Sequence, residues 1–280
     1  MKKNEEKQKS KPSTKRLFLT KGTCSNTFFY LLNQEFGHTI EVEEKASDPL
    51  AGGILLQGYQ CGMLWGSALA VGAESYRRCN DQGEAIGMAV TAAQDIVKSF
   101  TTRTNTVECS DITSTDWTSK LSMAKYAFTG KFMTCFNLSE NWAPEAIQAA
   151  KDGLKRGQAN SKKACASCAS MVIKKMGGSD EEVVTVAGLA GGLGLSGNGC
   201  GALAAAIWFR NIQLLKNDPK KNFSLKNPEL EEILKVFHQV TDYEMLCQDI
   251  TGRTFNTVEE HSKFIKDGGC EKIINALAAS

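Results

Sequence analysis

The sequence predicts an all-α protein built from two similar helical units that pack as a pseudo-dimer. Apolar residues recur at helical spacing in long windows, and alternation of the kind found in strands is nearly absent. Proline is scarce, with five in 280 residues, and a segment of about 139 residues is repeated. We expect about five helices in each unit, with the first unit at 16–142 and the second at 150–280. Residues 1–15 are lysine-rich and are expected to form a disordered tail.

Helical spacing and capping residues locate the individual elements. A first helix follows a cap at Thr23 or Ser25, and further apolar stripes run through residues 85–97 and 183–190. Nearly continuous apolar segments at 63–71 and 202–215 predict two buried helices. Near the C-terminus, Pro228 opens a helix that extends through Val240, and Thr257 with Glu260 forms a capping box for a shorter helix.

The repeat is visible in two separate blocks. AGGILLQGYQCG at 51–62 aligns with AGGLGLSGNGCG at 190–201, an offset of 139 from position 51 to position 190. CSDIT at 109–113 aligns with CQDIT at 247–251, an offset of 138. The second block lies outside the Gly/Ala-rich region and keeps nearly the same register. It therefore indicates a duplication and not a shared composition.

The ten cysteines divide as four, four and two under this repeat. The first series is Cys24, Cys61, Cys109 and Cys135, and the second series is Cys168, Cys200, Cys247 and Cys270. Cys79 and Cys165 remain outside both series. In each unit a Cys-Gly pair enters a buried helix, where the helix dipole and free N–H groups favour a thiolate or a metal-bound sulfur. Four thiolates suit a [2Fe–2S] cluster, a [4Fe–4S] cluster or zinc, so all eight series cysteines are predicted metal ligands.

Composition and motifs argue against several classes of protein. The formal net charge of +2 gives no field for binding nucleic acid, and no apolar run reaches the ~18 residues of a membrane span. The basic N-terminal segment lacks the apolar core of a secretory signal, which predicts a cytoplasmic location where thiols stay reduced. No P-loop, G-x-S-x-G or H-E-x-x-H motif occurs. Haem c is not expected, because the Cys165-x-x-Cys168 pair is followed by Ala169 where haem attachment needs histidine.

The order of the cysteines and the Cys-Gly boxes resemble the C_GCAxxG_C_C family of redox-active proteins, as two tandem copies covering nearly the whole chain. The matching residues are Cys24, Cys61-Gly62-Met63-x-x-Gly66, Cys109 and Cys135 in the first unit, and Cys168, Cys200-Gly201-Ala202-x-x-Ala205, Cys247 and Cys270 in the second. Met63 replaces the alanine of the family box and Ala205 replaces its last glycine, so both changes add bulk beside a cysteine. Split-Soret cytochromes carry a similar domain, in which an iron–sulfur centre accompanies haems.

The predicted function is therefore a redox-active iron–sulfur or other metal–thiolate protein that transfers electrons with an unidentified redox partner protein, with one four-cysteine site per unit. Two alternatives stay open. One is metal-free thiol–disulfide chemistry, for which Cys165 and Cys168 offer a C-x-x-C pair. The other is a non-catalytic binding protein whose cysteines are structural. The sequence does not decide whether the protein is an enzyme.

Overall fold

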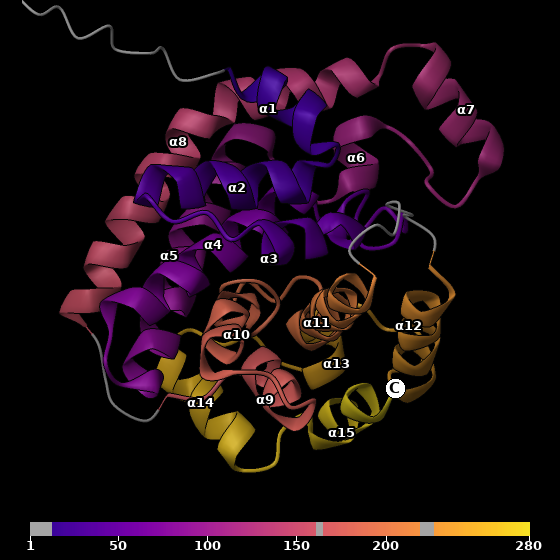
Figure 1. Ribbon diagram of the computed structural model, residues 1–280. Coiled ribbons are helices and arrows are strands. Elements are labelled where there is room, and N and C mark those ends of the chain that lie inside the picture. Colours follow the sequence, from indigo (N-terminus) through magenta and orange to yellow (C-terminus); the bar gives the residue numbers. More distant parts are fainter. Residues whose placement is uncertain (1–12, 161–164, 219–226) are drawn as a thin grey trace, which may run out of the picture.

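The protein is all-α in the computed structural model, which describes residues 13–160, 165–218 and 227–280. The described residues form fifteen α-helices and two short 3₁₀ helices, with no strand among them. The predicted all-α fold class is confirmed, but the described residues form eight α-helices in the first unit and seven in the second, more than the five expected in each. The additional helices are short, such as Cys109–Thr113 and Cys247–Thr251, and a helix of five residues does not show the periodicity of a longer one. Figure 1 shows the first unit, from indigo to magenta, packed above the second, from salmon to yellow.

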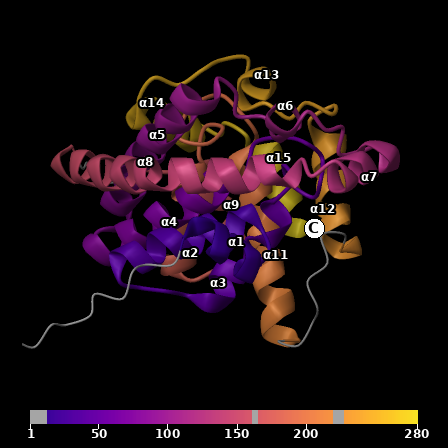
Figure 2. The ribbon, with the colours of Figure 1, turned by 90° about the horizontal axis from the view of Figure 1, so that it is seen from above.

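The first unit contains the longer helices. Its elements are α1 (Thr14–Lys21), α2 (Cys24–Phe36), α3 (Glu41–Ala46), η1 (Asp48–Leu50), α4 (Gly62–Arg78), α5 (Gln82–Thr104), α6 (Cys109–Thr113), α7 (Lys120–Phe128) and α8 (Phe132–Ala159). Figure 2 shows α8 running along one side of the whole molecule.

The second unit repeats this order, with some helices shorter than their counterparts, through eight elements. They are α9 (Cys168–Lys175), α10 (Asp180–Thr185), η2 (Ala187–Leu189), α11 (Gly201–Asn217), α12 (Pro228–Val240), α13 (Cys247–Thr251), α14 (Val258–Lys266) and α15 (Glu271–Ala279). Each element from α2 to α8 thus has a counterpart from α9 to α15, and α1 alone has none among the described residues. The duplication predicted from two sequence blocks therefore extends through the whole fold.

The two units also share the backbone hydrogen bonds at their Cys-Gly pairs. In each unit the backbone of the cysteine that precedes the buried helix is tied to the segment that precedes the third cysteine. The equivalent bonds are Cys61 N to Val107 O at 2.8 Å and Cys200 N to Met245 O at 3.0 Å, and Cys109 N to Tyr59 O and Cys247 N to Asn198 O, both at 2.7 Å. The backbone frame of the two candidate sites is therefore the same.

The two units pack through their buried helices. The described residues place α4 against α10 and η2, and α11 against the equivalent α3 and η1. Two side chains of α11 reach across: Trp208 Nε1 donates to Glu43 O at 3.0 Å, and Asn211 Nδ2 donates to Ala46 O at 3.1 Å. Gly72 stands at the position equivalent to Asn211, and a Cβ added there would lie 2.0 Å from the carbonyl oxygen of Thr185. This reciprocal packing is the predicted pseudo-dimer.

The limits of the first unit differ from those predicted. Helix α8 passes through 142–150 without a break, because Trp142, Ala146, Ala150 and Leu154 form a buried stripe that packs on α5. The first unit therefore continues beyond 142, to Ala159. At the other end, α1 begins at Thr14, so the last two residues assigned to the tail are helical. Residues 1–12 of the predicted tail lie outside the described residues.

Most predicted helix boundaries hold, and two details differ. Thr23 caps α2, and α12 runs from Pro228 to Val240 as predicted. The stripe at 183–190 is divided, because the chain tightens from α10 into η2 after Thr185. Thr257 caps α14, but the Glu260 carboxylate accepts from Asn256 N at 3.0 Å, so the predicted capping box is only half formed. No described helix combines the length and the apolar character that a membrane crossing requires.

Candidate functional site

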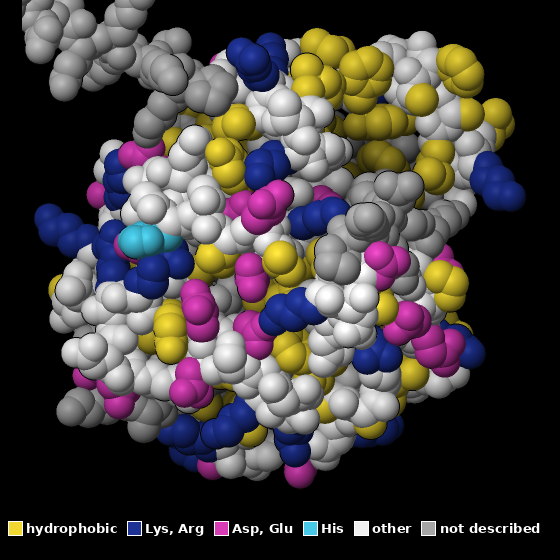
Figure 3. All heavy atoms as spheres, viewed as in Figure 1, with side chains coloured by type: hydrophobic (Ala, Val, Ile, Leu, Met, Phe, Trp, Pro, Cys, Tyr) yellow, Lys and Arg dark blue, Asp and Glu magenta, His cyan; other side chains and the backbone are white. Residues whose placement is uncertain are grey.

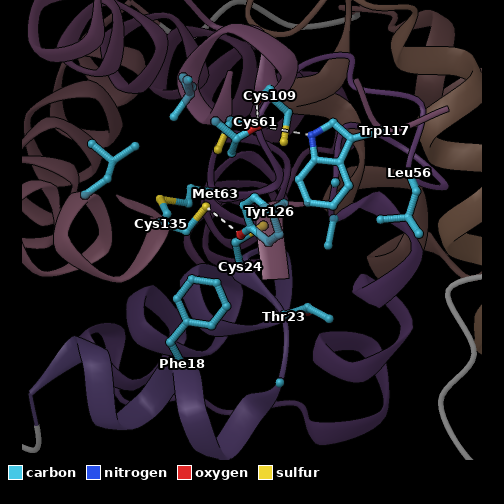
Figure 4. Close-up of a pocket in the computed structure, with 16 residues that line it drawn as sticks. Phe18, Thr23, Cys24, Leu56, Cys61, Met63, Cys109, Trp117, Tyr126 and Cys135 are labelled. Atoms are coloured by element: carbon cyan, nitrogen blue, oxygen red, sulfur yellow. Dashed lines mark hydrogen bonds between the residues drawn. The ribbon is translucent and has the colours of Figure 1, made fainter. Parts of the chain in front are cut away.

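The first series of cysteines comes from four separate elements and lines one cavity of about 240 Å³. Cys24 begins α2, Cys61 precedes α4, Cys109 begins α6 and Cys135 lies in the first turn of α8. Figure 4 shows these sulfurs around the cavity, with Trp117 and other large side chains closing it. Within the described part of the chain, the remaining wall is apolar, aromatic or hydroxyl-bearing, and no charged side chain lines it.

A left-handed turn precedes the Cys-Gly entry in both units. Residues 52–56 all have positive φ, between 50° and 72°, and residues 191–195 repeat this with φ between 60° and 77°. Left-handed geometry costs a residue other than glycine roughly 1–2 kcal/mol, yet Ile54, Leu55, Leu56, Leu193 and Leu195 all adopt it. Their burial holds the turn in place. Both copies of the repeat keep this strained backbone, which indicates that the turn is part of the site.

The turn helps to ionise the first sulfur of each series. The hydrogen bond from the Cys61 thiol lowers the pKa of Cys24, and backbone N–H groups of Gly52, Ser25 and Cys24 lower it further, against the opposing effect of burial. The same bond, together with burial, raises the pKa of Cys61 well above its usual value. The pair therefore favours a Cys24 thiolate beside a Cys61 thiol.

The other two sulfurs of the first series resist ionisation. Burial raises the pKa of Cys109 well above its usual value, and negative charge at Cys24 and Cys135 adds to this. Burial raises the pKa of Cys135 to about 11, although the Tyr126 hydroxyl, 3.5 Å from its sulfur, acts in the opposite direction (Figure 4). Four thiolates in this cavity therefore need positive charge that the protein's own side chains do not supply.

The second series converges in the same way. Cys168 and Cys247 begin α9 and α13, and Cys200 and Cys270 are the N-caps of α11 and α15. Burial, followed by negative charge at Cys168 and Cys200, raises the pKa of both Cys247 and Cys270. The four sulfurs are thus close enough to interact electrostatically, as the repeat predicts.

Backbone donors serve two sulfurs in the second unit. Burial raises the pKa of Cys168, while N–H groups of Gly191, Ala169 and Cys168 itself act to lower it. These donors are the counterparts of those at Cys24. Burial and the charge at Cys168 raise the pKa of Cys200 to about 12, against N–H groups of the first turn of α11.

The glycine after each entry cysteine is required by close packing. A Cβ on Gly62 would lie 2.6 Å from the sulfur of Cys24, and a Cβ on Gly201 would lie 1.9 Å from the carbonyl oxygen of Leu189. The two departures from the family box are accommodated, since Met63 and Ala205 are both buried and Met63 lines the cavity.

Cys79 and Cys165 lie apart from both series. Both pack against a small apolar cluster between the units, formed by Ala85, Ile86, Ala89, Val184 and Ala187. Cys165 faces α5, where its sulfur is 3.3 Å from the position of a Cβ added to Gly87. Cys168, by contrast, interacts with the second series. The C-x-x-C spacing therefore joins cysteines from two different environments.

The arrangement of the sulfurs also bears on metal binding. Among the described residues, no three His, Cys, Asp or Glu side chains stand close enough to hold one metal ion. None of the eight series cysteines forms a disulfide. The eight series cysteines are thus free thiols, and those of the first series surround a cavity. The metal-ligand role predicted for all eight stays a prediction.

Sequence reasoning missed the aromatic wall of the first site. The Trp117 and Tyr126 rings lie 4.8 Å apart, between their centroids, and the second unit repeats the pair as Phe255 and Phe264 at 5.1 Å. Both pairs keep the offset of 138 that relates the CSDIT and CQDIT blocks. Extending that register past the cysteines would have found them.

Comparison with known proteins gives one match. The family described as "Putative redox-active protein (C_GCAxxG_C_C)" matches residues 23–148 and again residues 163–280. No curated protein and no solved structure matches the chain. The two matches coincide with the two units and include all eight series cysteines. The chain therefore belongs to the C_GCAxxG_C_C family, of which it carries two tandem copies.

Proposed function

We propose that the protein transfers electrons and that each unit holds one iron–sulfur cluster on its four series cysteines. The observation that carries the proposal is convergence. In the first unit, four cysteines from four separate elements line one cavity, and in the second the equivalent four interact electrostatically. Membership of a family described as redox-active supports the same conclusion.

The chemistry of the donor set fits a cluster. Each iron takes only two cysteine ligands in a [2Fe–2S] cluster and only one in a [4Fe–4S] cluster, so four ligating sulfurs spread further apart than the four ligands of one ion. The irons would supply the positive charge that four thiolates lack in this cavity. Backbone N–H groups aimed at Cys24, Cys168 and Cys200 would stabilise metal-bound sulfur and tune its potential.

The test is metal and sulfide content of protein prepared without oxygen, with an ultraviolet–visible spectrum. We expect iron and acid-labile sulfide for two clusters per chain. Cys61→Ser should lose the cluster of the first unit and Cys200→Ser that of the second, so each halves the iron. Cys79→Ser is the matched control and should keep both. A colourless protein without iron, a protein holding zinc alone, or full iron in Cys61→Ser would contradict the proposal.

One observation favours a second candidate, a metal-free dithiol. The hydrogen bond between Cys24 and Cys61 sets a thiolate beside a thiol, which is the arrangement that thiol–disulfide exchange uses. Oxidation would join the two sulfurs, releasing two electrons and the Cys61 proton to a substrate disulfide, which becomes one thiol and one thiolate. Alkylation and mass spectrometry of metal-free protein across a glutathione series should then detect a Cys24–Cys61 bond. A protein with neither metal nor this bond would support structural cysteines.

A further inference from the structure

Large apolar side chains are exposed around the first site. Leu121 and Phe128 are 81% and 91% exposed, and the others are Leu19, Phe132 and Met133 at 70%, 39% and 44%. Figure 3 shows hydrophobic side chains gathered over α1, α7 and the start of α8, around a hollow in the surface. We call these five residues the apolar rim. A contiguous exposed patch of this kind marks an interaction site more often than single apolar residues do.

The rim is joined to the cavity of the first series through α7. This helix has no buried residue, and Leu121 and Phe128, seven residues apart, share one of its faces. On another face Tyr126 reaches Cys135 (Figure 4). At the other end of the rim, Phe132 contacts Phe136, which in turn contacts the cavity residue Phe18. A molecule seated on the rim would therefore lie close to the first site.

The second unit does not repeat the rim. The offset of 138 places Glu259 opposite Leu121 and Lys266 opposite Phe128. The equivalent helix α14 buries His261, Ser262 and Ile265 and packs on α5. Exposure of apolar residues is thus not a consequence of the shared fold. Among the described residues of the second unit, Tyr243 is the one large exposed hydrophobic residue, and it does not lie on α14.

The charge of the residues around the apolar rim indicates which kind of molecule binds there. Helices α1 and α7 carry no acidic residue, and their basic residues are Lys15, Arg16, Lys21, Lys120 and Lys125. Lys21 pairs with Glu44, and Asp111 and Asp116 precede α7, so the four remaining basic side chains of the two helices leave the surroundings basic on balance although the whole chain carries only +2. Residues 1–12 of the chain are lysine-rich, and their apolar members are Met1 and Pro12. They therefore supply neither the acidic charge nor the apolar surface that would complement the rim.

We infer that the apolar rim is the docking face for a redox partner protein whose apolar contact patch is bordered by acidic residues. The inference rests on the proposed function and assigns the first site as the point of electron entry. A short path through Gln60 and Gly199 connects the first site to the second. Gln60 contacts Gly199 between the units, where a Cβ on Gly199 would be 1.8 Å from Gln60 Oε1. Cys61 and Cys200 are the next residues in the chain.

The test compares electron uptake from two probes of the same cluster type and different charge, a reduced acidic [2Fe–2S] ferredoxin and the same ferredoxin with its surface carboxylates amidated, by stopped flow without oxygen. The rim variant is L121S/F128S. The matched control is E259S/K266S, which changes the equivalent positions of α14. With the ferredoxin we expect rapid, salt-sensitive uptake by the wild type, a loss of about tenfold in the rim variant and no change in the control. Uptake from the amidated ferredoxin should be slower than from the untreated ferredoxin.

Several results would overturn the inference. They are equal rates for the rim variant and the wild type, faster uptake from the amidated ferredoxin than from the untreated one, or a wild-type dimer that the rim variant disperses. Iron content and spectra of each variant are measured first, so failure of the proposed function is seen separately. If no cluster is present, ferredoxin binding followed by fluorescence anisotropy decides on docking alone. Binding weakened by L121S/F128S supports the rim, and no binding to the wild type overturns it.

Discussion

The two candidate sites share a backbone and differ in their surroundings. Both place the first cysteine beneath a left-handed turn whose glycine N–H reaches the sulfur, as Gly52 does at Cys24 and Gly191 at Cys168. In the first unit the Cys61 thiol also bonds to Cys24, and the aromatic wall includes a hydroxyl at Tyr126. The second unit has Phe264 at that position, and its described residues form no apolar rim.

The comparison of the two sites separates the features that both copies of the repeat keep from those that differ between them. The strained turns, the glycines after the entry cysteines and the sulfur positions persist, so they define the chemistry that both copies share. The side chains around the sulfurs and the outer surfaces differ between the units, so they determine which molecule can reach each site. Four substitutions test this division, starting with the largest expected effect.

Trp208→Ala tests whether the two units form one cooperative body. Trp208 is fully buried in α11 and donates to Glu43 O of the first unit, so its loss leaves a cavity and an unpaired carbonyl at the unit interface. We expect the free energy of unfolding to fall by about 3–5 kcal/mol, with a single transition in urea. The matched variant Leu69→Ala, at the equivalent buried position of α4, should cost about 2–5 kcal/mol. Two separate transitions in the wild type would contradict the pseudo-dimer.

Asp48→Asn tests a polar difference between the units. Burial raises the pKa of Asp48 from 3.8 to about 6, although the Thr23 hydroxyl and the Asn26 amide donate to it. Ala187 is its counterpart in the second unit. A raised carboxyl pKa stabilises the fold below pH 3.8, and this stability is lost as the pH rises through 6. The wild type should therefore lose about 3 kcal/mol relative to Asp48→Asn between pH 4 and pH 7. Parallel unfolding curves across this range would refute the assignment.

The fold was predictable from the sequence because its signals are periodic and repeated. Helical spacing gave the long helices, and the caps at Thr23 and Pro228 gave two of the boundaries. The end of the first unit at 142 was wrong because α8 continues on a stripe that packs against α5, and the register of that stripe depends on a helix far away in the chain.

The candidate sites were predictable in composition but not in their surroundings. The repeat divided eight cysteines into two series, of which the first lines one cavity, and the glycines indicated a turn at each entry. The role of these cysteines as metal ligands stays a prediction. The handedness of that turn was not predictable, since Ile54 and Leu193 disfavour positive φ and adopt it only because tertiary packing holds them. Tyr126 and the exposed face of α7 have no local signal, because an isolated helix does not reveal which side meets the cavity.

Gly52→Ala tests the shared part of the comparison. The added Cβ would lie 2.4 Å from Leu56 Cδ2 and so disturb the turn that donates to Cys24. We expect the pKa of Cys24 to rise in reduced, metal-free protein, with alkylation by iodoacetamide about tenfold slower at pH 8. Gly37→Ala is the control, with φ of 84° and nothing within 4 Å of the new Cβ. It should cost roughly 1–2 kcal/mol of stability and leave the alkylation rate unchanged. Equal slowing of alkylation in Gly52→Ala and Gly37→Ala would show that the turn does not act on the Cys24 sulfur.

Tyr126→Phe gives the smallest effect and addresses the divergent wall directly. It converts the first site to the composition of the second, where Phe264 occupies the equivalent position. The hydroxyl 3.5 Å from the sulfur acts to lower the pKa of Cys135, so its removal should raise that pKa above 11 and slow alkylation of Cys135 at pH 10 about two- to threefold. Stability should change by about 1 kcal/mol or less, because a single side-chain hydrogen bond is lost. The reverse change, Phe264→Tyr, should speed alkylation of the second series only if its fourth cysteine meets the ring as Cys135 does. Unchanged Cys135 reactivity in Tyr126→Phe would mean that the aromatic wall shapes the cavity without tuning its sulfurs.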